Sequence, residues 1–160
     1  MSPRKSRHVS SLTAGEMLFQ SDAGSLTALT ADRFPILEGL SVKRLVLEPG
    51  SIREPHWHAN ATELTYCLSG DLLVGMLGNS DSFSCFTIGS GQMFTAPSGA
   101  LHHIENVGDT TAELIVAFRD ERPEDFSFRA SLAAMSDAVL GNTYGLDASA
   151  FSALDRDGEV

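Results

Sequence analysis

The sequence has few cysteines, few basic residues and no long apolar run. Only two of its 160 residues are cysteines, Cys67 and Cys85. That is too few for a disulfide framework and fits a reducing compartment, although one bridge between them stays open. Eleven Lys and Arg against 21 Asp and Glu give a formal net charge of −10, and such a surface repels nucleic-acid phosphates. No run approaches the roughly 18 apolar residues of a membrane span, and no apolar stretch follows the basic start as a secretory signal would require. We therefore predict a cytoplasmic protein without nucleic-acid or membrane partners.

The length and composition favour one folded domain with flanking segments. Hydrophobic residues make up 42% of the chain, enough for a single core. Residues 1–12 are polar and basic and predict a mobile tail. Residues 13–125 contain short apolar runs separated by turn signals about every 8–12 residues, which predicts an antiparallel sandwich or barrel. Residues 126–160 predict a helical segment packed on the barrel, so the fold class is mainly β with a short helical end.

Several local signals mark the expected element boundaries. Glu48-Pro49-Gly50 and Ser69-Gly70-Asp71 are typical of turns. Between residues 13 and 40 the pattern is weak, and Leu26–Leu29 and Phe34–Leu37 fit either edge strands or loops. In the last segment, Ser131–Leu140 has helical spacing, Gly141 and Gly145 are candidate helix ends, and Asp147 is a candidate cap for a final short helix.

Four of the five histidines fall in two short windows. His56 and His58 are two residues apart, so on a strand both imidazoles project from one face. Glu63 can return at the start of the next strand, and His102 must come from another strand to close the set. Three imidazoles and one carboxylate suit Mn²⁺, Fe²⁺, Co²⁺, Ni²⁺ or Zn²⁺, and positions left open on the ion indicate a catalytic rather than a structural site. His103 neighbours His102 on the opposite strand face, and we expect it to be a hydrogen-bonding residue rather than a ligand.

The two windows resemble the paired cupin motifs G(X)5HXH(X)3–4E(X)6G and G(X)5PXG(X)2H(X)3N. All fixed positions are filled, by Gly50, His56, His58, Glu63, Gly70, Gly91, Pro97, Gly99, His102 and Asn106. The resemblance implies a double-stranded β-helix, the jelly-roll barrel of cupins. It also implies that His56, His58, Glu63 and His102 are the metal ligands, and that Asn106 is structural.

A narrower resemblance, over roughly residues 24–154, is to oxalate decarboxylase and germin-like proteins, carried by the run Arg53-Glu54-Pro55-His56-Trp57-His58. It implies that Mn²⁺ is the favoured ion, with Fe, Ni, Co or Zn as alternatives, and that Arg53 binds a substrate carboxylate. Strict alternation would put Arg53 on the face opposite His56, unless a bulge at Pro55 breaks the parity. We expect Trp57, Asn60 and Phe94 to contribute to the substrate pocket.

Two departures from that family affect the functional prediction. Oxalate decarboxylases carry two cupin domains, so a homodimer is expected to stand in for the pair. Their lid sequence Ser-Glu-Asn-Ser-Thr is not kept in the loop Glu121–Ser127, where Glu124 is the candidate proton-transfer residue and Pro123 stiffens the chain. We predict an enzyme acting on a small carboxylate. The alternatives are an Fe or Cu dioxygenase for a larger aromatic substrate and a non-catalytic metal- or small-molecule-binding cupin.

Overall fold

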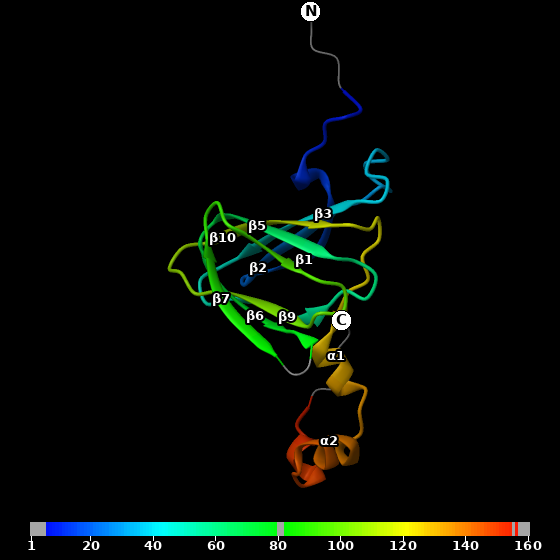
Figure 1. Ribbon diagram of the computed structural model, residues 1–160, viewed down its shortest axis with the longest axis vertical. Coiled ribbons are helices and arrows are strands. Elements are labelled where there is room, and N and C mark those ends of the chain that lie inside the picture. Colours follow the sequence, from blue (N-terminus) through cyan, green and yellow to red (C-terminus); the bar gives the residue numbers. More distant parts are fainter. Residues whose placement is uncertain (1–5, 80–81, 155, 157–160) are drawn as a thin grey trace, which may run out of the picture.

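The computed structural model describes residues 6–79, 82–154 and 156, which form two antiparallel sheets packed face to face (Figure 1). In order across the first sheet, the described strands are β1 (Glu16–Ser21), β2 (Gly24–Leu29), β3 (Ser41–Leu47), β10 (Ala112–Phe118), β5 (Glu63–Ser69) and β8 (Met93–Ala96). In order across the second sheet, they are β11 (Phe126–Ser127), β4 (Ile52–Trp57), β9 (His102–Asn106), β6 (Asp71–Leu77) and β7 (Phe83–Gly89). This is the predicted mainly β jelly-roll architecture.

The core lies between the sheets because the strands alternate buried and exposed residues. On β10 every second residue from Ala112 to Phe118 is buried, and on β3 the buried series ends at Leu45 and Leu47. Facing them from the second sheet are Leu72 and Ile104. Each fully buried aliphatic side chain contributes about 1.5–3 kcal/mol relative to its exposed state. This apolar layer supports the polar end of the barrel where the histidines lie.

Both predicted turns form as expected. The Ser51 N–H donates to the Glu48 carbonyl at 3.0 Å across the first, with Gly50 at φ +74°. Gly70 joins β5 to β6 at φ +93°, and a Cβ built there would meet the Cβ of Ala112 at 2.5 Å. The second turn therefore needs glycine both for its backbone conformation and for its close contact with β10.

The weakly patterned region contains one strand that sequence reasoning missed. All six residues of β1 are exposed, so the strand has no buried face and no alternation to detect. It forms because its backbone pairs with β2. The candidate strand Phe34–Leu37 is a turn region in the structure, whereas Leu26–Leu29 belongs to β2.

The helical end of the chain has two helices in the region where one was expected over Ser131–Leu140, followed by the expected short last element. Its described elements are the helices α1 (Phe128–Ala133) and α2 (Asp137–Tyr144) and the 3-10 turn η3 (Ala148–Phe151). Ser136 separates the helices because its side chain accepts the Val139 N–H as the N-cap of α2. Gly145 ends α2 at φ +66° and Asp147 caps η3, as predicted, while Gly141 lies buried inside α2.

The two helices differ in where they pack. The main contacts of α1 are with β4 and β11, whereas those of α2 are with η3, and Figure 1 shows α2 beyond α1 on the side away from the sheets. None of the described helices is long and apolar enough to cross a bilayer. At the other end of the chain, residues 1–5 of the predicted tail fall outside the described residues, and Leu12–Ala14 form the 3-10 turn η1.

Candidate metal centre

The structure brings the four candidate ligands together at one end of the barrel. Nitrogen or oxygen atoms of His56, His58, Glu63 and His102 all lie within 4.8 Å of one another. His56 and His102 are paired across β4 and β9, His58 follows β4, and Glu63 begins β5 on the facing sheet. All four side chains are buried, with exposed fractions of 1–3%. Each element thus delivers one or two ligand atoms to a point shielded from water.

Each imidazole is oriented by a backbone carbonyl. The Nδ1 atoms of His56, His58 and His102 lie 2.8, 2.9 and 2.9 Å from the carbonyl oxygens of Glu54, Glu124 and Ala100. A carbonyl only accepts, so each Nδ1 carries the proton and each neutral ring leaves the lone pair on Nε2. This is the usual outer arrangement around histidines that bind a metal through Nε2.

Glu63 lies between two of the Nε2 atoms. Its Oε2 is 3.0 Å from His58 Nε2 and 3.2 Å from His102 Nε2, and Thr65 Oγ1 donates to its Oε1 at 2.6 Å. Burial alone would raise the pKa of Glu63, but hydrogen bonds from His102 and His58 outweigh it and hold the pKa below its ordinary value. Conversely, burial would lower the pKa of His102, yet the Glu63 carboxylate raises it.

These observations fit a divalent cation. With every Nδ1 already donating, His58 and His102 can donate to Glu63 through Nε2 only as imidazolium ions, which are costly to bury. His56 resists protonation: burial first, then the Arg53 charge and the His102 charge, lower its pKa to about 3. A divalent cation among the Nε2 atoms and the Glu63 carboxylate satisfies all four groups without extra protons.

A bulge in β4 decides where Arg53 points. Arg53 is paired with Ile104 and His56 with His102, with a register shift between the two pairs. Ile104 and His102 are two residues apart on β9 and face inward, so Arg53 and His56 share the inner face although they are three residues apart. The bulge at Glu54-Pro55 thus places Arg53 on the inner face of β4, whereas strict alternation would have placed it on the face opposite His56.

A small cavity of about 20 Å³ adjoins the ligands, large enough for about one water molecule. Its lining residues are Leu26, Lys43, Leu45, Arg53, His56, His58, Glu63, Ile104, Val116, Phe118 and Asp125.

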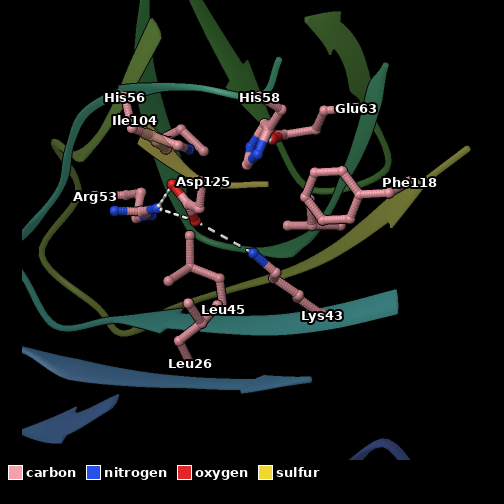
Figure 2. Close-up of a pocket in the computed structure, with 11 residues that line it drawn as sticks. Leu26, Lys43, Leu45, Arg53, His56, His58, Glu63, Ile104, Phe118 and Asp125 are labelled. Carbon is pink, nitrogen blue, oxygen red and sulfur yellow. Dashed lines mark hydrogen bonds and ion pairs between the residues drawn. The ribbon is translucent and has the colours of Figure 1, made fainter. Parts of the chain in front are cut away.

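Figure 2 shows the Asp125 carboxylate between the histidines and Leu45, where it faces the cationic groups of Arg53 and Lys43. Arg53 Nη2 donates to its two oxygens at 2.8 and 2.6 Å, and Lys43 Nζ lies 3.3 Å from Oδ2. Burial would raise the pKa of Asp125, but Arg53 and Lys43 outweigh it and lower the pKa.

The loop that carries Asp125 is fastened to the ligand segment. The Asn60 side chain accepts the Glu124 N–H at 2.8 Å and donates to the Arg122 carbonyl at 3.1 Å. The Glu124 carbonyl accepts from His58, and Glu121 accepts the Gly39 N–H at 2.8 Å. These contacts hold the loop of residues 120–125 across the cavity, and we call it the closing loop.

The structure places the other predicted site residues outside the cavity lining. Trp57 stacks on Phe126, with ring centroids 5.5 Å apart, and Phe94 packs edge-on against Phe86 in the core. Asn60 contacts the closing loop, and Glu124 is exposed and meets the site through its backbone. The closing-loop acid that lines the cavity is its neighbour, Asp125. Sequence reasoning missed Asp125 and Lys43; strand alternation on β3 would have placed Lys43 inward, but no spacing rule positions a loop side chain.

The remaining cysteine and histidine predictions concern residues away from the centre. Cys67 is buried and Cys85 exposed, and both are free thiols in this structure. His103 lies on the outer face of β9, where its ring covers Gly75: a Cβ built on that glycine would fall 2.2 Å from the ring. His103 is therefore separate from the ligand cluster.

Comparison with known proteins agrees with this architecture. The Cupin family model matches residues 10–151. Germin-like protein 3-8 of Oryza sativa subsp. japonica is 33% identical over 130 residues, covering 78% of this chain and 58% of the relative, and germin-like protein 5-1 of the same plant is 35% identical over 116 residues, covering 71% and 52%. A solved structure of Bacillus subtilis oxalate decarboxylase, in a study of its Mn(II) centres, superimposes with a TM-score of 0.85 at 26% identity, covering 92% of this chain and 39% of that one.

The fold, the buried ligand cluster and the extent of the match lead to one conclusion: the chain belongs to the cupin family. Its relatives among cupins include germin-like proteins and oxalate decarboxylase. The chain spans a little over half the length of these germin-like relatives and about two fifths of the decarboxylase chain.

Proposed function

We propose that this cupin is a divalent-metal-dependent enzyme that acts on a small carboxylate, with Mn²⁺ as its resident ion. The observation that carries the proposal is the buried set of three Nε2 atoms and one carboxylate, beside the cations Arg53 and Lys43. A strongly acidic protein repels anions overall, so these two cations are the local attraction that a carboxylate needs. The likeness to oxalate decarboxylase, described by its Mn(II) centres, supports the same choice of ion and substrate class.

Each group around the cavity has a distinct role in the proposed reaction. The bound ion would supply a Lewis acid for the carboxylate oxygen. Arg53 and Lys43 would hold and orient the carboxylate by charge-assisted hydrogen bonds. Asp125 would move a proton: its pKa is low while it is paired with Arg53 and Lys43, and it rises towards the ordinary value once a substrate takes those partners. Decarboxylation needs a proton at the carbon that loses CO₂, and the closing loop carries this acid to the cavity. Glu124, the acid proposed from the sequence, is the alternative if the loop rearranges.

An Fe or Cu dioxygenase for a larger, aromatic substrate is the second candidate. The observation that favours it is a groove of about 660 Å³ beside the cavity, much larger than oxalate requires. A third candidate is a non-catalytic cupin that binds metal or a small molecule. We propose a homodimer in a cytoplasmic setting for each of the three.

The test measures metal and turnover together. Elemental analysis of untagged protein should find about one ion per chain, with Mn²⁺ predominant. The Mn²⁺-loaded protein should release CO₂, formate or hydrogen peroxide from oxalate or other small acids. His56→Ala should lose both metal and turnover, whereas His103→Ala, the matched histidine outside the cluster, should retain both. Stoichiometric metal without turnover for any acid or metal would favour the non-catalytic candidate.

A further inference from the structure

A second, larger hollow adjoins the metal cavity. It is a groove of about 660 Å³ between β1–β3 of one sheet and β4, β11 and α1 of the other, within the usual size range of small-molecule sites. Its apolar lining consists of Leu18, Phe19, Ala23, Leu26, Leu45, Val46, Leu47, Ile52, Ala130 and Ala133. A groove of this size and composition can bury the apolar body of a ligand.

The groove and the cavity meet at the Asp125 carboxylate. Four residues line both hollows: Leu26, Leu45, Arg53 and Asp125. In Figure 2 the carboxylate lies with the histidines on one side and the two leucines on the other. The ion pair between Asp125 and Arg53 is therefore the partition between the metal cavity and an apolar space.

The contacts of Asp125 also indicate which chemical group binds between the groove and the metal cavity. Arg53 and Lys43 have side chains only 19% and 10% exposed, and both contact this one carboxylate. Glu54 lies farther away, at 4.0 Å from Arg53 Nη1. Two largely buried cations aimed at one carboxylate make a carboxylate site, and the closing loop fills it with its own side chain. A ligand carboxylate can replace Asp125 because the loop, unlike the strands, is held by a few side-chain contacts.

We propose that the substrate is a carboxylate with an apolar body. Its carboxylate replaces that of Asp125 beside Arg53 and Lys43, and its apolar body lies in the groove against Leu26, Leu45 and Ile52. This inference rests on the proposed function, whose substrate class it narrows. A dicarboxylate as short as oxalate has no apolar body and leaves the apolar part of the groove unused.

The experiment measures binding of straight-chain carboxylates from acetate to octanoate to the metal-loaded full-length protein by calorimetry. Each added methylene should lower the Kd about fourfold until the groove is filled, the equivalent of about 0.8 kcal/mol per buried CH₂. Octanol should bind at least about tenfold more weakly than octanoate because it lacks the charge.

Two substitutions in the groove test its role. Ile52→Asp should abolish the chain-length dependence, whereas Val107→Asp, a matched change at a similarly exposed apolar residue outside the groove, should preserve it (Ile52 and Val107 are 54% and 49% exposed). Ala130→Leu keeps the groove apolar but shortens it, so binding should stop improving at a shorter chain.

Each contrary result overturns the inference separately from the proposed function. Equal binding of acetate and octanoate, or an unchanged chain-length series in both groove variants, would exclude the groove as the binding site even if short acids are converted. If Ile52→Asp instead changes the oligomeric state and no carboxylate shows chain-length dependence, the groove is covered by a second copy. Lack of metal, by contrast, would refute the proposed function itself.

Discussion

The ligand cluster and the closing loop lie against each other but are held in place in different ways. The four ligands lie on strands or at their ends, and carbonyls of the protein backbone orient each histidine. The closing loop is held by side chains, chiefly Asn60, and its Asp125 is held by two cations. Strand pairing is cooperative and hard to displace, whereas a few side-chain contacts on a surface loop open at a much lower free-energy cost.

This difference suggests separate tasks. A metal site needs fixed distances, because ligand atoms must stay within a few tenths of an ångström of their positions. A substrate entrance needs a part that can move and return. Among the described residues, the hydrogen bond from His58 Nδ1 to the Glu124 carbonyl connects a ligand directly to the loop backbone, so a change in the loop reaches the cluster through that ring.

The largest expected effect is in the cluster itself. Glu63→Gln removes the one anionic ligand and leaves three neutral imidazoles, so we expect metal affinity to fall by at least about 100-fold. Competition with a chelator of known affinity measures it. Glu113→Gln, which alters only the surface pair with Arg44, serves as the control and should retain wild-type affinity. Equal affinities in the two variants would mean that Glu63 is not a ligand.

The second prediction addresses the boundary between the two regions. Lys43→Met keeps the length of the side chain over Phe118 but removes its charge, 3.3 Å from Asp125. We expect carboxylate affinity to fall about 10-fold or more, the usual weight of a hydrogen bond to a charged group, with metal content unchanged. Arg44→Met, the next residue on the outer face, should alter neither quantity. Loss of metal in Lys43→Met would instead show that the cavity cations hold the cluster together.

The same contrast explains what the sequence can predict. His56 and His58 share a face because strand geometry is regular, and Gly50 and Gly70 mark turns that only glycine fits well. These rules are local, so short spacings suffice for the ligand cluster and the jelly roll. Arg53 needed one further fact, the register shift in β4, which Pro55 suggests but does not specify.

No such local rule predicts which side chain of the closing loop faces the cavity. Glu124 and Asp125 are adjacent acids, and which one faces the cavity depends on Asn60 and on Lys43, residues 64 and 82 positions away along the chain. Strand β1 escaped prediction for a related reason: all its residues are exposed, so backbone pairing alone defines it.

The third prediction concerns how the stability of the metal-free protein depends on pH, because the buried imidazole of His56 is difficult to protonate. Burial, Arg53 and His102 lower the pKa of His56 from 6.5 to about 3 in the metal-free fold. The unfolded chain therefore takes up this proton at a higher pH than the folded chain, and stability is lost as the pH falls from about 6.5 to about 3. Above 6.5 this residue makes no pH-dependent contribution.

Urea unfolding of the chelator-treated protein measures this effect. The free energy of unfolding should fall more between pH 7.5 and pH 4.5 in the wild type than in His56→Gln, which cannot take up the proton. The raised pKa of His102 acts in the opposite direction in both proteins, so a larger fall in the wild type is attributed to His56 and its interaction with His102. An equal fall in the two proteins would contradict the assignment of a buried neutral imidazole.

The smallest expected effect is in the loop. Asn60→Ala removes two hydrogen bonds to residues 122 and 124, each worth about 1 kcal/mol, while the strands that carry the ligands stay paired. Hydrogen exchange at residues 120–125 should become several-fold faster, and exchange in β5 and β9 should not change. Metal affinity should fall only modestly, about 10-fold at most, because the Glu124 carbonyl then orients His58 less firmly. Asn142→Ala on the exposed surface of α2 is the control and should leave exchange in the loop as it is. Faster exchange throughout β5 and β9 would show that loop and cluster unfold as one unit, and the division of tasks between a fixed metal site and a movable entrance would not hold.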